Sequence, residues 1–191
     1  MSTETPANTS DPSVQNQGSR VKVEIEVQPP SSVGINRRLI PPVVARTNNP
    51  QLIEDYLAGN KDVFAVAMLT SSNGDDQTAI LNGNYSTQGQ PITLHGSNGG
   101  SHGGGSSSRQ SAHKWIYFIF QGLSIPIPGA YTFTICVNAL SYTEGFSMTV
   151  GGKTTNEFTV VNQAVAPARP SRSEQRVLQT LQNYNLYDPR A

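Results

Sequence analysis

Alternation of apolar and polar residues divides the chain into short strands. The first is 21–27, where four apolar residues alternate with three charged ones, and the period of two predicts a strand with one solvent-facing side. Further apolar runs predict strands at 43–45, 63–69, 79–81, 92–95, 139–150 and 157–161. Because these strands are short and separated by brief turns, the pattern favours a mainly β protein with an antiparallel β-sandwich.

The segment from Trp115 to Val137 is the most apolar part of the chain. Residues 115–120 are apolar almost without interruption, which is typical of a strand covered on both faces or of a strand whose outer face meets a partner. Residues 131–137 alternate, which predicts a half-buried strand. Two prolines and a glycine at 126–129 interrupt the pattern, so we expect a hairpin-like unit with a turn between its two strands.

Two other segments have helical spacing. Ser171 and Glu174 form a capping box, and the apolar residues of 171–185 fall on one face, which predicts an amphipathic C-terminal helix. That apolar face packs on the chain's own sandwich or binds a partner, and packing is favoured because most such stripes face a core. Residues 51–58 are also spaced as a short helix, with an irregular connection as the alternative.

Composition predicts one folded domain with two unpacked segments. Residues 1–19 are polar and contain hardly any apolar side chains, so we expect a disordered tail followed by a single domain at 20–187. Residues 96–112 are mostly Gly and Ser and are predicted to form a flexible loop within that domain. Residues 1–19 lack a secretory signal, and no stretch reaches transmembrane length, so we expect an intracellular protein without membrane contact.

Charge and reactive side chains argue against several kinds of function. Thirteen basic residues balance thirteen acidic ones, so a nucleic-acid contact would have to come from a local patch. Cys136 lies in an alternating strand and is expected to be a packed thiol, not a nucleophile. The irregular spacing of His95, His102 and His113 does not predict a metal site, and we expect no cofactor. Since no catalytic set of residues is found, neither an enzyme nor a small-molecule substrate is expected.

Three motifs occur in a fixed order along the chain. The central one consists of Phe118, Phe120, Leu123, Ile125, Gly129, Tyr131 and Phe133. Upstream of it lie Leu81 and Gly83 followed by Tyr85 and Ser86, and further upstream Gln28, Pro29, Gly34, Arg37, Arg38, Pro41 and Pro42. Together these motifs resemble the fungal velvet domain, whose fold is similar to the immunoglobulin-like Rel-type DNA-binding domains. The resemblance spans roughly residues 21–186 and implies an immunoglobulin-like β-sandwich.

The resemblance implies a nuclear regulator of transcription, present also in the cytoplasm, that controls development, sporulation and secondary metabolism. Such a regulator would bind DNA selectively through loops at one end of the sandwich. Arg37 and Arg38 would contact phosphates or base edges, with Arg46 and Lys22 contributing. On the residues alone, the Arg37–Arg38 pair has two other interpretations, namely a solvated loop pair or a salt bridge to a glutamate of the first strand.

The resemblance also implies a dimer, formed with a second copy or with another velvet protein. Trp115 and Tyr117 on the central strand, or Leu178 and Leu181 on the C-terminal helix, are the expected partner contacts. The alternative function is a β-sandwich interaction subunit that lacks its own DNA binding and works only through a velvet partner. The zero net charge and a shortened loop at 29–34 without basic residues favour it. A carbohydrate-binding sandwich, with aromatic side chains as stacking platforms, is disfavoured because alternation buries most of them.

Overall fold

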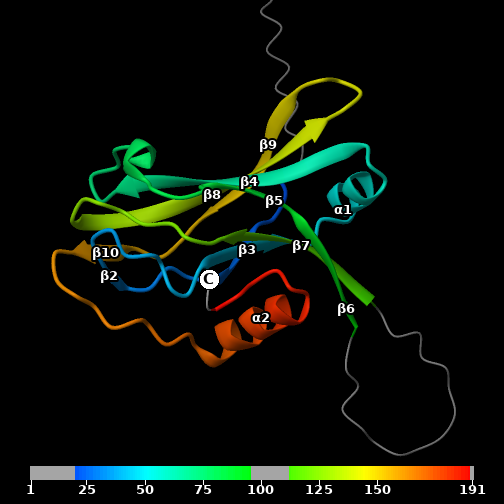
Figure 1. Cartoon of the computed structure of the whole chain (residues 1–191). Helices are drawn as coiled ribbons and strands as arrows, with labels where there is room; N and C mark the ends of the chain where they lie inside the picture. Colours follow the sequence, from blue (N-terminus) through cyan, green and yellow to red (C-terminus); the bar gives the residue numbers. More distant parts are fainter. Residues whose placement is uncertain (1–19, 96–111, 190–191) are drawn as a thin grey trace, which may run out of the picture.

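The computed structural model describes residues 20–95 and 112–189, which form two packed β-sheets with a helix on the outside of one sheet (Figure 1). The predicted tail at 1–19 and almost all of the predicted loop at 96–112 lie outside the described residues. A mainly β fold with two sheets and a C-terminal helix is therefore confirmed.

The smaller sheet, sheet A, has the strand order β1-β3-β7-β6. Its strands are β1 (Glu24–Val27), β3 (Val43–Thr47), β7 (Ala112–Phe120) and β6 (Gln90–His95). The larger sheet, sheet B, has the order β2-β10-β8-β4-β5, and β9 also pairs with β8. Its strands are β2 (Ser32–Gly34), β10 (Phe158–Val161), β8 (Gly129–Ser141), β4 (Lys61–Ser71), β5 (Ser86–Gln88) and β9 (Ser147–Thr154). All pairs are antiparallel except β2 with β10, which is parallel, so the prediction of a wholly antiparallel sandwich is wrong at this edge.

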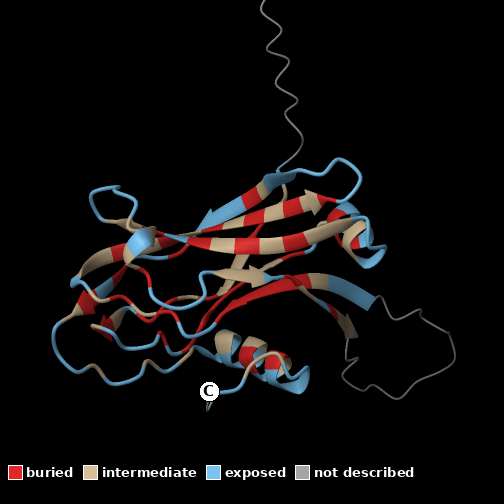
Figure 2. Ribbon diagram, turned by 45° about the horizontal axis from the view of Figure 1, so that its top comes forward, coloured by how far each residue is buried: buried red, intermediate tan, exposed pale blue. Residues whose placement is uncertain are grey.

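Side chains from the facing sides of the two sheets form the main core. Figure 2 shows buried residues alternating along the strands where the sheets face each other. The apolar side chains of the central motif belong to this core, and all of them are buried: Phe118, Phe120, Leu123, Ile125, Tyr131 and Phe133. The apolar residues of the central motif are therefore explained by packing in the core.

The strand β7 is covered on both faces, which explains its unbroken run of apolar residues. Ile116, Phe118 and Phe120 face the main core, whereas Tyr117 and Ile119 face α2 (Arg172–Asn183). The helix α2 lies across the outer face of sheet A, as Figure 1 shows. The outer face of β7 and the apolar face of α2 could each have packed within the chain or bound a partner. In the structure they pack against each other.

Three predicted elements differ from the structure. The predicted hairpin at 115–137 is wrong, because β7 lies in sheet A and β8 lies in sheet B. The eight residues 121–128 cross between the sheets, and two apolar side chains of this connection are buried in the main core. The predicted strand at 79–81 is replaced by the short 3-10 helix η1 (Thr78–Ile80). The predicted strand at 139–150 is wrong, because its first residues end β8, a turn follows, and its last residues begin β9. By contrast, the predicted helix near 51–58 is present as α1 (Pro50–Leu57), with Asn49 as its N-cap.

Candidate nucleic-acid interface

The loop between β2 and β3 holds Arg37 and Arg38 in a constrained position. Asn36, at a φ of 55°, turns the chain, and its amide donates to the carbonyl of Ile125 at 2.9 Å. After the arginines, the amide of Leu39 donates to the carbonyl of Leu123 at 2.9 Å, and the Leu39 side chain is buried. Backbone hydrogen bonds on both sides of the pair therefore fix the loop, while both arginine side chains are exposed.

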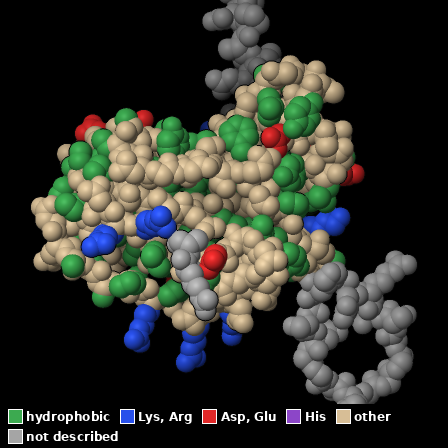
Figure 3. Space-filling model, viewed as in Figure 1, with side chains coloured by type: hydrophobic (Ala, Val, Ile, Leu, Met, Phe, Trp, Pro, Cys, Tyr) green, Lys and Arg blue, Asp and Glu red, His purple; other side chains and the backbone are tan. Residues whose placement is uncertain are grey.

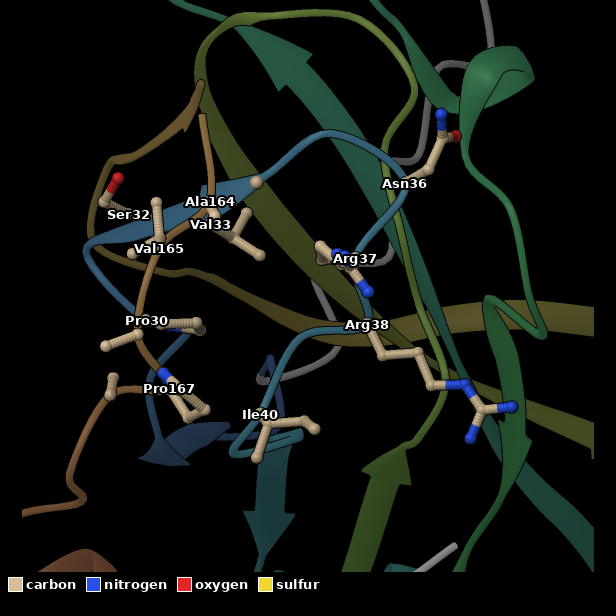
Figure 4. Close-up of a pocket in the computed structure, with 13 residues that line it drawn as sticks. Pro30, Ser32, Val33, Asn36, Arg37, Arg38, Ile40, Ala164, Val165 and Pro167 are labelled. Atoms are coloured by element: carbon tan, nitrogen blue, oxygen red, sulfur yellow. The ribbon is translucent and has the colours of Figure 1, made fainter. Parts of the chain in front are cut away.

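A cleft lies beside the two arginines. It has a volume of about 510 Å³ and separates the β2–β3 loop from residues 164–168, the segment that follows β10. Figure 4 shows the Arg38 side chain extending away from the apolar residues Val33, Ile40 and Pro167. The apolar residues thus form the wall of the cleft, and the guanidinium of Arg38 lies outside that wall.

The structure contradicts the salt-bridge interpretation of this pair. Glu24 and Glu26 on β1 instead bind Arg46, whose Nη2 lies 3.1 Å and 3.0 Å from their carboxylate oxygens. Among the residues that the structure describes, neither Arg37 nor Arg38 forms a salt bridge. Both guanidinium groups are therefore available for an anionic ligand.

Arg46 does not join the loop arginines, because it lies toward the far end of β3. Its guanidinium stacks on the ring of Trp115 at 3.7 Å and donates a hydrogen bond to the Tyr117 hydroxyl at 3.2 Å. Burial lowers the pKa of Arg46, but the Tyr117 hydrogen bond and the two glutamates outweigh that effect and raise it. The prediction that Arg46 contacts DNA does not fit this arrangement, since its donors are already occupied within the chain.

Lys22 belongs to the same acidic neighbourhood as Arg46. Its Nζ lies 2.6 Å from a carboxylate oxygen of Glu24, and its side chain is 77% exposed. An exposed pair of this kind contributes about 0–1 kcal/mol and exchanges readily with solvent. The four predicted DNA-binding residues therefore form two groups, of which only Arg37 and Arg38 lack a carboxylate partner among the described residues.

The four predicted partner contacts lie together in one cluster. Tyr117, Leu178 and Leu181 are buried against one another between sheet A and α2, and Trp115 is half-buried beside them. While α2 is docked, the three buried side chains are covered by the chain itself, and a partner would reach them only by displacing the helix. Trp115 is partly exposed and lines a pocket with His113 and Lys114.

Two surface features were not singled out from the sequence. The first is a set of exposed arginines along the C-terminal segment, Arg169, Arg172 and Arg176. A signal for them exists in the sequence, since Arg172 and Arg176 lie four residues apart on the helix side opposite its leucines. The second is the β8–β9 hairpin, where Tyr142, Phe146 and Met148 are at least 49% exposed.

Metal and thiol chemistry finds no support in the described part of the chain. No group of three or more His, Cys, Asp or Glu side chains there could hold a metal ion. The Sγ of Cys136 lies 3.8 Å from the Sδ of Met68, and burial raises the pKa of the thiol, which disfavours the nucleophilic thiolate. His113 is exposed, His102 lies outside the described residues, and no described helix is long and apolar enough to cross a membrane.

A scan against protein-family models found no match, and no curated protein matches the sequence.

Proposed function

We propose that this protein is a velvet-type regulator of transcription that binds DNA through the loop carrying Arg37 and Arg38. In this proposal the two-sheet fold is an immunoglobulin-like sandwich, and the protein acts in the nucleus as a homodimer or as half of a heterodimer with another velvet protein. Its output would be control of fungal development, sporulation and secondary metabolism. It would have no catalytic activity.

The observation that carries the proposal is the pair of exposed arginines on a fixed loop. A guanidinium group donates two parallel hydrogen bonds to phosphate oxygens, and a loop that is already ordered loses little entropy on binding. The backbone hydrogen bonds of Asn36 and Leu39 supply that order on either side of the pair. Since Arg37 and Arg38 have no carboxylate partner among the described residues, a phosphate would not have to displace one.

The motif residues add a second line of support. The apolar side chains of the central motif lie in the core, and the Arg37–Arg38 motif lies at a loop next to it. Leu39, directly after the pair, is bonded to Leu123 of the central motif through its backbone. A signature that combines a core pattern with a loop attached to that core fits a domain whose scaffold positions a binding loop.

A second candidate function is a protein-interaction subunit without DNA binding of its own. The exposed apolar side chains at the β8–β9 hairpin favour it, with Tyr142 at 62% exposure and Phe146 and Met148 near one half. The pairing of Lys22 and Arg46 with glutamates also favours it, because two of the four predicted DNA contacts are thereby neutralised. In this alternative the hairpin, and not the arginine loop, would be the functional surface.

A DNA titration at several salt concentrations separates the two candidates. The full chain is added to fluorescently labelled duplex DNA, and the slope of log K against log salt concentration is compared with that of Arg37→Ala/Arg38→Ala. Removing two phosphate contacts lowers the slope by about 1.8, since each contact contributes roughly 0.9. The control is Lys114→Ala/Lys153→Ala, which removes the same charge from two exposed positions elsewhere.

The lysine variant shows whether a loss of affinity comes from the arginine loop or from the change in net charge alone. If the loop variant and the lysine variant weaken binding equally, the loop is not the DNA site. If the wild type does not bind duplex DNA even at low salt, the DNA-binding proposal is wrong and the interaction subunit becomes the better account.

A further inference from the structure

One part of the surface is mainly basic although the whole chain is neutral. On the face in Figure 3, most Lys and Arg side chains lie over α2 and beside β2 and β10, most Asp and Glu side chains lie along the upper edge, over sheet B, and one acidic side chain lies close to the basic groups. The C-terminal segment contributes three exposed arginines to the basic part: Arg169, Arg172 and Arg176. Among the described residues none of the three forms a salt bridge.

The geometry of α2 directs its arginines away from the protein. Leu178 and Leu181 face sheet A and are buried. At 100° per residue, Arg172 and Arg176 lie on the opposite side of the helix, one turn apart. Two further exposed polar residues, Gln179 and Asn183, continue this outer stripe toward the helix C-terminus. The outer stripe of α2, defined by these four residues, therefore contains only hydrogen-bonding or cationic side chains.

Arg172 occupies a position that helix electrostatics disfavour. It is the first residue of α2, where the positive end of the helix dipole stabilises carboxylates and opposes cations. The acidic residue of this first turn, Glu174, is already engaged, because its carboxylate accepts hydrogen bonds from the Ser171 amide at 2.8 Å and the Gln28 amide at 3.0 Å. Arg172 therefore does not stabilise the helix through its dipole, and it forms no salt bridge among the described residues. A side chain that breaks a local stability rule in this way is a candidate for binding a ligand.

The arginines of α2 are connected in space to the loop arginines. Residues 164–168 line the same cleft as Arg37 and Arg38, and the chain runs from that cleft directly into Arg169 and then α2. Between 162 and 187 the only acidic residue is the engaged Glu174. The loop, the connecting segment and the helix thus carry arginines that form no salt bridge among the described residues, and one acidic residue, Asp188, lines a small cleft with Arg38.

We propose that the outer stripe of α2, together with Arg169, is a second phosphate-binding surface that contacts the same DNA duplex as the β2–β3 loop. This inference rests on the proposed DNA-binding function. The arginines release counterions from the backbone, and Gln179 and Asn183 donate hydrogen bonds to phosphate or sugar oxygens. These contacts read no sequence, so they raise affinity and fix the orientation of the protein while base reading stays with the loop.

The test compares three variants of the full chain in the same salt titration on duplex DNA. Arg172→Ala/Arg176→Ala is expected to lower the salt slope by about 1.8, whereas Arg172→Lys/Arg176→Lys keeps the charge and is expected to keep the slope. The third variant is Arg37→Ala/Arg38→Ala. Because the substituted side chains are exposed, we expect α2 to stay folded in each variant, and circular dichroism checks this.

The outcomes separate this inference from the proposed function. A loss of slope in the loop variant alone overturns the α2 surface and leaves the DNA-binding loop standing. A loss in the α2 variant alone supports the α2 surface and shows that the loop was wrongly assigned. Absence of DNA binding by the wild type overturns both, as does binding of the wild type to anionic phospholipid vesicles in place of DNA.

Discussion

Truncating Leu181 tests how firmly α2 is held against sheet A. Leu181 is 0% exposed and lies in the cluster formed with Leu178, Tyr117 and Ile119. Replacing a buried leucine with alanine removes apolar contacts and leaves a cavity, which costs about 2–5 kcal/mol. A small domain has only about 5–15 kcal/mol of total stability, so this loss is large.

The position of Trp115 makes this loss measurable at the helix itself. Trp115 is the only tryptophan of the chain and packs against the cluster beneath α2. Its fluorescence therefore reports the docking of α2 during urea unfolding, while circular dichroism reports the strands of both sheets. Three hydrogen bonds also hold the helical segment, among them Tyr184 to the Thr93 carbonyl at 2.8 Å and Gln121 to the Leu186 carbonyl at 3.0 Å. We expect Leu181→Ala to shift the fluorescence transition and to speed hydrogen exchange of the α2 amides.

The matched control is Leu57→Ala. Leu57 is also a helical leucine, in α1, but it is 52% exposed. Its truncation should change the free energy of unfolding by no more than about 0.5 kcal/mol. If Leu181→Ala changes the urea midpoint of the fluorescence transition no more than Leu57→Ala does, the contacts of Leu181 do not hold α2 against sheet A.

Two further predictions concern pH and a glycine. A hydrogen bond from Lys22 lowers the pKa of Glu24 below 4.5, so Glu24 stabilises the fold above pH 4.5, and this stability is lost as the pH falls through the folded pKa. Burial raises the pKa of Glu26 above 4.5, so ionisation of Glu26 lowers the stability of the fold as the pH rises above 4.5. We therefore expect the free energy of unfolding of the wild type in urea, measured from acid to neutral pH, to exceed that of Glu24→Gln by an amount that grows with pH. The difference between wild type and Glu26→Gln should shrink with pH. If the free energies of wild type and of either variant change in parallel with pH, the corresponding prediction is wrong. Gly83 and Gly145 both have positive φ, which costs alanine about 1–2 kcal/mol, but of the two only Gly83 would place a Cβ 2.6 Å from a backbone oxygen, that of Gly122. Gly83→Ala should therefore lower the melting temperature more than Gly145→Ala does. Equal losses would contradict this prediction.

Local patterns predicted the elements whose residues alone determine them. The capping box of Ser171 and Glu174 gives α2 the start expected from the sequence, and both halves of the box are formed. The alternation in 131–137 lies within β8, whose buried and half-buried positions alternate from Tyr131 to Ser141. In each case the period of the apolar residues matches the period of the element, so no distant contact is needed to make the prediction.

The failures come from contacts that a local pattern does not contain. The turn-like residues at 126–129 are compatible with a hairpin and with a crossing between sheets, and only the pairing of β8 with β4 and of β7 with β3 decides. Arg46 looked like a free cation because its partners on β1 lie about twenty residues away in the sequence and become neighbours only when β1 pairs with β3. The very short strands β2 and β5 carry too few residues to show a period.

The same separation between sequence and space explains how a neutral chain can present a charged surface. Arg46 and Lys22 share the carboxylates of β1, so the charges of this part of sheet A cancel locally. The arginines of the β2–β3 loop and of α2 form no salt bridge among the described residues, and the segment that leads into α2 lines the cleft beside Arg37 and Arg38. If α2 binds phosphate as proposed, burial of Leu178 and Leu181 serves binding as well as the fold, because a docked helix holds its cations in place before DNA binds and avoids the entropy cost of ordering them afterwards.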